Sequence, residues 1–164
     1  MNQMKINEFL RESNAIEGVY DEDSLKQAKL AFAYLMSEKV MTPSVVLATH
    51  KILMLHLPLF PNEKGYFRNI TVYIGGKAAL NAVKIREHMD EWCEKMNETI
   101  SVDFLDLEKM SRELHVEYEG IHPFVDGNGR TGRMFMNWHR INKLALPLLT
   151  ITEDDRHEYY KWFV

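Results

Sequence analysis

The chain has 164 residues, of which 46% are hydrophobic and 27% are charged, and its formal net charge at pH 7 is −4. This balance predicts a single folded domain over residues 1–164 and argues against a disordered chain. The acidic excess offers no basic surface for nucleic acid, so we expect no nucleic-acid partner. The lone Cys93 fits a reducing compartment, and no apolar run approaches the roughly 18 residues of a membrane span. We therefore expect a cytoplasmic protein without a membrane anchor.

Helical periodicity dominates the sequence, because apolar residues recur at spacings of three and four between helix start and stop signals. Asp23 or Ser24 is the expected N-cap of the first clear helix, and Thr42–Pro43 is a typical start for the second. The expected helices cover residues 25–35, 43–53, 79–96, 104–118, 134–143 and 154–164. The last one stops on Trp162, Phe163 and Val164, which predicts that the natural chain continues.

Residues 65–76 depart from the helical pattern. Ile70, Val72 and Ile74 alternate there with polar or aromatic residues between glycines, which is typical of a strand. A lone strand or hairpin on a helical domain has an unpaired edge, and an extended peptide can pair with such an edge. The sequence therefore predicts an all-α bundle with one small β-hairpin.

The most unusual chemistry lies in residues 122–133, which read His-Pro-Phe-Val-Asp-Gly-Asn-Gly-Arg-Thr-Gly-Arg. The turn formed by Gly127, Asn128 and Gly129 allows positive φ angles and close backbone approach. If a helix begins at this turn, its free N–H groups and its dipole favour an anion. Arg130 and Arg133 lie three residues apart at that start, so both guanidinium groups can bind the same phosphates.

Two further side chains complete the parts of a phosphorus-transfer site. Asp126 would repel a phosphate unless a hard cation lies between them, so its presence predicts Mg²⁺. His122 is the only group in the segment that can take a proton near neutral pH. The segment therefore predicts an enzyme that binds a nucleoside triphosphate together with Mg²⁺.

Residues 122–133 resemble the signature of the Fic (filamentation induced by cAMP) family, His-x-Phe-x-Asp/Glu-Gly-Asn-Gly-Arg-x-x-Arg, and meet every fixed position. The resemblance covers about residues 10–164. It implies an adenylyltransferase that moves AMP from ATP to a Tyr, Thr or Ser hydroxyl of a target protein. In that family the histidine, here His122, takes the proton of the hydroxyl, and the acidic residue, here Asp126, binds Mg²⁺. The second arginine, here Arg133, orients the γ-phosphate. Doc toxins, which transfer phosphate instead, lack this arginine.

The resemblance also assigns the target-binding and nucleotide-binding surfaces. Residues 65–76 are similar to the family's flap, a hairpin that clamps an extended segment of the target. The flap residues expected to bind the target are Tyr66, Phe67, Ile70, Thr71, Val72, Tyr73 and Ile74. Tyr159 and Tyr160 resemble the tyrosines that line the adenine pocket of the family, and Asn137 is a further candidate for that pocket.

A second motif suggests a built-in inhibitor. Residues 13–18, Ser-Asn-Ala-Ile-Glu-Gly, resemble the family's inhibitory motif Ser/Thr-x-x-x-Glu-Gly/Asn, with Ser13, Glu17 and Gly18 at its fixed positions. On a helix, Ser13 and Glu17 project from one face because they lie four residues apart. The resemblance implies an N-terminal inhibitory helix at about residues 8–18, whose Glu17 pairs with Arg133. A carboxylate there occupies the donors that the γ-phosphate requires.

Three other functions stay open on the sequence. Some family members remove AMP from the target, with the inhibitory glutamate positioning water, so Glu17 also fits a deAMPylase or a bifunctional enzyme. His115, Glu119 and His122 fall on one face of a continuous helix and would suit a zinc or iron hydrolase. A non-catalytic binding module is the third alternative, which the intact His122 disfavours. The sequence identifies neither the target protein nor whether the chain forms a homo-oligomer.

Overall fold

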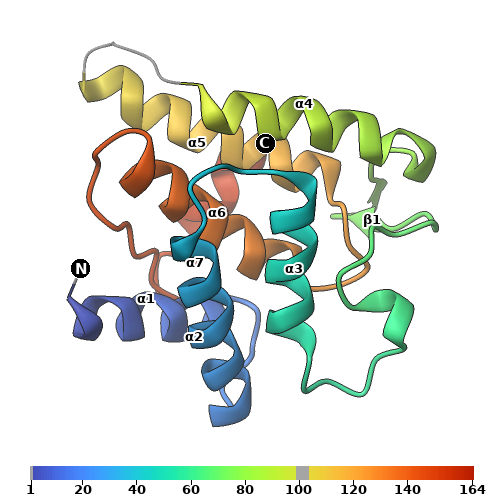
Figure 1. Cartoon of the computed structure of the whole chain (residues 1–164), viewed down its shortest axis with the longest axis horizontal. Coiled ribbons are helices and arrows are strands. Elements are labelled where there is room, and N and C mark those ends of the chain that lie inside the picture. The colour runs from blue at the N-terminus through green and yellow to red at the C-terminus, as the bar shows by residue number, and fades with distance from the viewer. Residues whose placement is uncertain (1, 99–103) are drawn as a thin grey trace.

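The computed structural model describes residues 2–98 and 104–164 of the chain. The structure is a bundle of helices with one two-stranded antiparallel sheet, which confirms the predicted all-α fold with a small hairpin (Figure 1). The helices are α1 (Gln3–Ile16), α2 (Glu22–Ser37), α3 (Pro43–Met54), α4 (Ile85–Asn97), α5 (Phe104–Ile121), α6 (Asn128–Asn142) and α7 (Arg156–Tyr160). The strands are β1 (Tyr73–Ile74) and β2 (Lys77–Ala78).

Helix α6 is the centre of the bundle. It contacts α1, α2, α3 and α5, and its residues are buried almost without interruption from Asn128 to Arg140. In Figure 1, α4 and α5 run side by side along one side of α6, and α1 and α2 cover the opposite side. The glycine-rich segment supplies the first turn of α6, so the position of that segment is set by the packing of the whole core.

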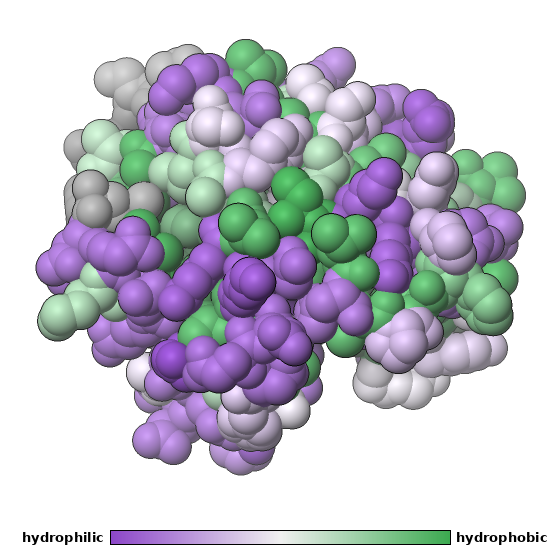
Figure 2. Space-filling view, turned by 60° about the horizontal axis from the view of Figure 1, so that its bottom comes forward, coloured by the Kyte–Doolittle hydropathy of each residue, from purple (hydrophilic) through white to green (hydrophobic). Residues whose placement is uncertain are grey.

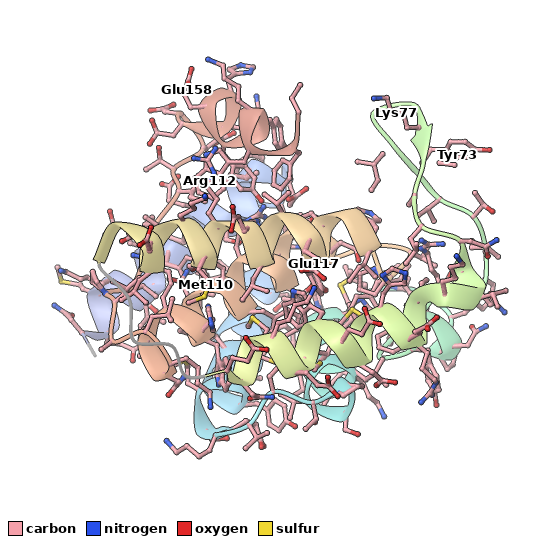
Figure 3. All side chains as sticks on the ribbon, turned by 90° about the horizontal axis from the view of Figure 1, so that it is seen from above. Tyr73, Lys77, Met110, Arg112, Glu117 and Glu158 are labelled. Atoms are coloured by element: carbon pink, nitrogen blue, oxygen red, sulfur yellow. The ribbon has the colours of Figure 1, made fainter. Side chains whose placement is uncertain are left out.

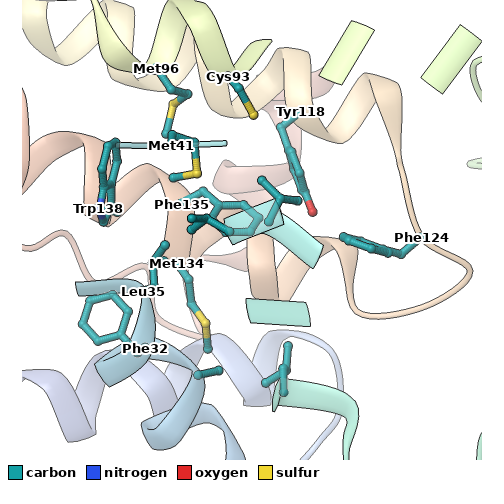
Figure 4. Close-up of a cluster of buried hydrophobic side chains, with 14 of the residues drawn as sticks. Phe32, Leu35, Met41, Cys93, Met96, Tyr118, Phe124, Met134, Phe135 and Trp138 are labelled. Atoms are coloured by element: carbon teal, nitrogen blue, oxygen red, sulfur yellow. The ribbon is translucent and has the colours of Figure 1, made fainter. Parts of the chain in front are cut away.

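The core around α6 is aromatic and sulfur-rich (Figure 4). Phe135 lies edge-on to Trp92 of α4 and Tyr118 of α5, with ring centroids 5.8 and 5.3 Å apart. All three side chains are at most 1% exposed. Burial of one such side chain stabilises the fold by about 1.5–3 kcal/mol relative to exposure. The aromatic contacts therefore hold α4 and α5 firmly against α6.

Local capping signals place the helix starts. Thr42 caps α3 as predicted, because its side chain accepts a hydrogen bond from the Val45 N–H. The prediction for α2 was wrong by two or three residues, since Asp21 is the N-cap and its carboxylate accepts from the Ser24 N–H at 2.7 Å. Helix α5 continues through Gly120 and ends just before the His122–Pro123 pair.

Three predicted elements are shorter in the structure than in the sequence analysis. The strand predicted over residues 65–76 is reduced to β1, because Arg68 bonds the His122 and Pro123 carbonyls of the turn that precedes α6. The helix predicted over residues 79–96 begins only at Ile85, after a 3-10 turn. The helix predicted over residues 154–164 divides into α7 and a 3-10 turn at Lys161–Phe163.

The surface carries both hydrophobic and hydrophilic patches. Figure 2 shows one face on which hydrophobic residues gather near the centre and hydrophilic residues border them. Within residues 2–98 and 104–164, every helix is too short or too polar to span a bilayer.

One titratable group, His139, is buried in the core. His139 lies in α6 and is 1% exposed, and neither ring nitrogen has a hydrogen-bond partner among the described residues. Burial lowers the pKa of His139 to about 4, from 6.5 in the unfolded chain, and the nearby Lys143 and Arg140 act in the same direction. The folded protein therefore holds this imidazole in its neutral form at pH 7.

Replacing His139 by Leu should make stability less sensitive to acid. The contribution of the neutral imidazole is fully present above pH 6.5 and is lost as the pH falls from 6.5 to about 4, where the unfolded chain binds the extra proton. In that window His139 lowers the free energy of unfolding by up to about 1.4 kcal/mol per pH unit. Urea denaturation across the window should give a shallower slope for His139→Leu and an unchanged slope for the exposed control His157→Leu. An unchanged slope in His139→Leu would contradict the assignment.

Candidate active site

The turn between α5 and α6 has a special backbone. His122 has a φ of 50°, which takes the chain out of α5, and Gly127 has a φ of 82° directly before α6 begins. A Cβ atom at Gly127 would lie 3.0 Å from Met54 Sδ and 3.4 Å from His50 Nε2. Both the left-handed conformation and the close approach of α3 therefore require glycine at this position.

Phe124 and Asn128 fix the turn from within. The Phe124 ring is fully buried and stacks on His50, with centroids 3.6 Å apart and planes 5° apart. The Asn128 side chain accepts from the Phe124 N–H and donates to the Phe124 carbonyl, each at 2.9 Å. Asn128 was predicted to bind ATP, but its side-chain amide holds the turn, and only its backbone is left for an anion.

His50 supports the turn from α3. Its Nδ1 accepts a hydrogen bond from the Gly65 N–H at 2.9 Å, so Nε2 carries the ring proton and donates to the Asp126 carbonyl at 2.9 Å. Burial lowers the pKa of His50 to about 4, which keeps this arrangement neutral. Sequence reasoning assigned no role in the site to His50, because its spacing on α3 is that of an ordinary core residue.

Arg68 ties the hairpin segment to the same turn. Its buried guanidinium donates to the carbonyls of His122 at 2.7 Å and Ile121 at 3.3 Å. It also donates to the carbonyls of Ile70 at 2.7 Å and Leu80 at 2.6 Å, which flank the hairpin. One side chain therefore sets the hairpin relative to the backbone of His122. The one sequence signal was a basic residue directly after two aromatic residues in a predicted strand.

His122 is positioned to act as a base. Its Nδ1 lies 3.3 Å from the Glu119 carbonyl, which favours the tautomer with the proton on Nδ1 and leaves the Nε2 lone pair free to accept a proton. Burial lowers the pKa of His122, and the neighbouring Arg68 acts in the same direction. The imidazole is therefore neutral near pH 7, as a general base requires.

Asp126 and Arg130 form the outer part of the site. The Asp126 side chain is 60% exposed, and its Oδ1 accepts from the Gly127 N–H at 2.6 Å. Its Oδ2 lies 3.6 Å from the Arg130 guanidinium, which is 3% exposed. An exposed carboxylate with one oxygen free of hydrogen bonds, beside a helix N-terminus, fits Mg²⁺ held together with phosphate and water oxygens. Burial lowers the pKa of Arg130 without removing its charge at pH 7.

Arg133 points from α6 into the end of α1. The side chain is 1% exposed, and its Nη2 donates to Glu17 Oε1 at 2.8 Å. Its Nε donates to Ser13 Oγ at 2.9 Å, and Nη2 also donates to the Ser13 carbonyl at 2.8 Å. Ser13 and Glu17, two of the three fixed residues of the N-terminal motif, therefore both contact the second arginine of the signature at residues 122–133.

Glu17 lies at the N-terminus of α6. A methyl group at Gly129 would overlap Glu17 Oε1, so the carboxylate rests against the backbone of the first turn, where the helix favours an anion. The predicted helix over residues 8–18 was too long at this end and too short at its start, because α1 runs from Gln3 to Ile16 and Glu17 is its C-cap. Gly18, with a φ of 71°, ends the helix.

Arg133 has a further partner in Tyr159. The Tyr159 hydroxyl accepts from Arg133 Nη1 at 3.2 Å and donates to His115 Nε2 at 2.8 Å. Burial, and then the charge of Arg133, lower the pKa of His115 to about 3, so His115 is a neutral acceptor. Within the described residues no three acidic, histidine or cysteine side chains form a metal-binding group, so the alternative zinc or iron site at His115, Glu119 and His122 was wrong.

These groups surround a cavity of about 540 Å³. Figure 3 shows the hairpin tip, with Tyr73 and Lys77, and α7, with Glu158, rising on the same side of α5. The cavity lies between them and above the start of α6. Its lining includes Glu17, His122, Gly129, Arg133, Tyr159 and Tyr160. A smaller hollow of about 110 Å³ adjoins it and reaches Asp126 and Arg130.

One predicted binding residue lies elsewhere. Asn137 is fully buried, and its amide bonds the backbone of Leu149 in both directions, so it stabilises the chain after α6 and does not line the cavity. Phe67 is partly buried and packs against Phe124, with ring centroids 5.8 Å apart. The exposed flap residues are Tyr66, Ile70, Thr71, Tyr73 and Ile74, and Val72 is partly buried.

The helical bundle and the glycine-rich turn before its central helix are the features to compare with known protein families. Residues 40–139 match the sequence model of the Fic/DOC family, and the chain belongs to that family. A protein named "Protein adenylyltransferase Fic" from Drosophila grimshawi is 29% identical over 133 residues, which is 78% of this chain and 26% of that protein. A protein of the same name from Aedes aegypti is 31% identical over 117 residues, 71% of this chain and 23% of that protein. The chain thus spans about a quarter of the length of these relatives.

Solved structures agree on the fold. Fic-1 from C. elegans has a TM-score of 0.79 at 19% identity, covering 98% of this chain and 55% of that chain. A Fic-domain-containing signaling protein from Bacteroides thetaiotaomicron has a TM-score of 0.76 at 18% identity, covering 98% of this chain and 70% of that chain. At such identities the likeness establishes the fold alone.

Arg68→Met should destabilise the protein through the carbonyls that it leaves without donors. Each buried carbonyl that loses its partner costs about 1–3 kcal/mol, and Arg68 serves carbonyls on both sides of the hairpin. We expect the free energy of unfolding to fall by about 2–4 kcal/mol in urea denaturation. The free energy of unfolding of Arg68→Lys should lie between those of the wild type and Arg68→Met, since one ammonium serves fewer carbonyls. The exposed control Arg86→Met should stay within about 0.5 kcal/mol of the wild type. A loss no larger than that of the control would show that these hydrogen bonds are dispensable.

Proposed function

We propose that this protein transfers AMP from ATP to a hydroxyl of a target protein, and that Glu17 inhibits the transfer. The observation that carries the proposal is the meeting of His122, Arg133 and the N-terminus of α6 at one cavity, with Glu17 paired to Arg133 at 2.8 Å. The names of the matched relatives from Drosophila grimshawi and Aedes aegypti support the same reaction. The reducing cytoplasm, with ATP and Mg²⁺ at hand, is the proposed setting.

The proposed reaction is one displacement at phosphorus. The hydroxyl oxygen of the target attacks the α-phosphorus of ATP and forms the new P–O bond. The bond from the α-phosphorus to the oxygen that bridges to the β-phosphate breaks, and pyrophosphate leaves with that electron pair. The hydroxyl proton passes to His122, whose Nε2 lone pair is free. AMP is then esterified to the target, and His122 is an imidazolium until it releases the proton.

The other residues of the cavity bind and orient ATP in this proposal. The first N–H groups of α6 and the guanidinium groups of Arg130 and Arg133 hold the phosphates. Asp126 would hold Mg²⁺, which neutralises phosphate charge when bound. Tyr159, Tyr160 and the hairpin enclose the remainder of the nucleotide, since all three line the larger cavity. The exposed edge of β1 pairs with an extended segment of the target.

Inhibition in this proposal is a competition for one set of donors. Arg133 is buried and carries a full charge, so it needs an anion beside it. Glu17 and the γ-phosphate of ATP are both anions that fit this position. While Glu17 occupies it, the triphosphate cannot take the orientation in which the α-phosphorus faces the attacking hydroxyl.

Removal of AMP is the second candidate function. The Glu17 side chain is 35% exposed and lines both hollows together with His122. A carboxylate at that position is able to orient a water molecule toward the phosphorus of a bound AMP ester. This candidate assigns Glu17 a catalytic role in place of an inhibitory one. Replacing Glu17 would slow the reaction in the catalytic role and speed it in the inhibitory role.

His122→Ala should abolish AMP transfer and leave the fold and ATP binding largely intact. Loss of a general base typically costs about 10²–10⁴-fold in rate. The assay is transfer of label from α-labelled ATP with Mg²⁺, into the protein itself and into proteins of a lysate, with ATP affinity measured by calorimetry. His157→Ala, on the exposed surface, is the matched control. Label transfer by His122→Ala at the wild-type rate would place the base elsewhere.

Glu17→Gly should raise AMP transfer by at least about tenfold, which corresponds to roughly 1.4 kcal/mol of activation free energy. Glu17→Gln should raise it too, because the charge is lost while the length is kept. Arg133→Ala should not reproduce the gain, since it removes the phosphate contact as well. The double variant should be as slow as Arg133→Ala, as expected of coupled groups. An unchanged rate in Glu17→Gly refutes inhibition, and slower AMP removal without faster transfer favours the second candidate.

A further inference from the structure

Glu119 is a buried carboxylate to which the proposed reaction assigns no role. It lies on α5, one helical turn before His122, and its side chain is 13% exposed. It lines the larger cavity together with Glu17 and Arg133. Its Oε1 is buried and has no hydrogen-bond partner among the described residues. Its Oε2 lies 3.9 Å from His122 Nδ1, so the carboxylate faces the imidazole.

Such a placement is unfavourable for the charged form of Glu119. Burial raises the pKa of Glu119 to about 7, the charge of Arg133 opposes this rise, and the carboxylate of Glu17 adds to it. A glutamine has the same shape but no charged form, so burial at this position would carry no such penalty. A carboxylate at a desolvated position in a cavity is a candidate for a role in the chemistry.

We propose that Glu119 is a positioning residue for His122. The Glu119 carboxylate orients the His122 imidazole through Nδ1 and stabilises the imidazolium that forms during AMP transfer. The inference rests on the proposed function, because it adds a partner to the base of that reaction. In this proposal Glu119 acts through His122. The carbonyl and the carboxylate of the same residue thus face one ring nitrogen, at 3.3 and 3.9 Å.

The electrostatic surroundings of His122 create the need for such a partner. Burial and the cation of Arg68 both disfavour a proton on this ring, so the imidazolium is costly to form. Asp126 and Glu17 favour it, but Asp126 is committed to the outer site and Glu17 must leave Arg133 before the triphosphate is held. Glu119 remains beside Nδ1 in both states because it belongs to α5.

The charged and titratable groups around the pair come from several elements, and His115 lies one helical turn from Glu119 on α5, beside the same Gly132. Those that act on Glu119 come from α1, α5, α6 and α7, and those that act on His122 include groups of the hairpin segment and of the turn before α6. They are Glu17, Arg133, Tyr118, Tyr159 and Tyr160 for Glu119, and Arg68, Glu17 and Asp126 for His122. If the Glu119 carboxylate acts on the imidazole across the 3.9 Å that separates them, the two protons of the pair should bind in two macroscopic steps that belong to both residues.

The first test follows the protonation of His122 without any catalysis. In the full-length protein without nucleotide, the ring resonances of His122, assigned with His122→Gln, should titrate in two steps, one of them near pH 7. In Glu119→Gln the step near pH 7 should vanish, and His122 should titrate once, at a pKa lower by about one unit. Glu117 lies on the same helix as Glu119 and pairs with Lys95 of α4 at the surface, so Glu117→Gln should leave the titration unchanged.

An identical His122 titration in wild type and Glu119→Gln overturns the proposal. Because this readout needs neither ATP nor a target, it stands apart from the fate of the proposed function. If transfer of AMP is absent while the coupled titration is present, the pairing holds and the reaction class is wrong.

The second test separates positioning of the base from nucleotide binding. In the Glu17→Gly background, Glu119→Gln should lower kcat by about tenfold or more with little change in KM for ATP, since about one pKa unit of the base is lost. The acid limb of the rate profile should move to lower pH. Glu119→Asp should recover part of kcat, because it restores the charge at a greater distance. A raised KM with unchanged kcat contradicts the proposal and makes Glu119 a nucleotide contact.

Discussion

The structure depends on one buried charge, the guanidinium of Arg133. A desolvated cation of this kind is tolerated only when every donor has a partner and an anion lies close by. Ser13 and Glu17, from the end of α1, satisfy two of its nitrogens, and Tyr159 satisfies the third. The same contacts fix α1 against α6 and seat the segment after α6 over the cavity. The contacts of Ser13 and Glu17 with Arg133 therefore both hold the N-terminal segment in the fold and balance the charge at the site.

The turn before α6 is held mainly by hydrogen bonds to neutral groups, namely the His50 ring, the Asn128 amide and backbone carbonyls. His50, held neutral by burial, bridges the hairpin segment and the Asp126 carbonyl, while Asn128 closes the turn from inside. Arg68 adds the hairpin by bonding carbonyls only, so its charge is spread over several dipoles. A carboxylate also takes part in the turn, since Asp126 Oδ1 accepts a hydrogen bond from the Gly127 N–H at 2.6 Å. In the proposed mechanism, Asp126 Oδ2 is left for the metal and the Glu17 carboxylate for competition with phosphate.

The parts that the sequence predicted are those coded by neighbouring residues. Thr42–Pro43 starts α3 and the glycine-rich run starts α6, because caps and turns are local. The predicted strand was too long since residues 65–70 are held by contacts with the turn that precedes α6, more than fifty residues away. Asn137 was misassigned because its partner, Leu149, is set by the path of the chain after α6. Sequence periodicity carries no information on such contacts.

In the proposed mechanism, exchange of anions at Arg133 links inhibition to substrate binding. If Glu17 left with nothing in its place, a charge that is 1% exposed would remain uncompensated, which is strongly unfavourable. In the proposed mechanism the γ-phosphate therefore has to arrive as Glu17 departs, and each makes the other's binding weaker by the same factor. Mutations that loosen α1 would then strengthen binding of the productive triphosphate without touching the cavity. In this mechanism α1, which packs on α2 and α6, would set the threshold for activity, and the strength of that packing would determine how high the threshold is.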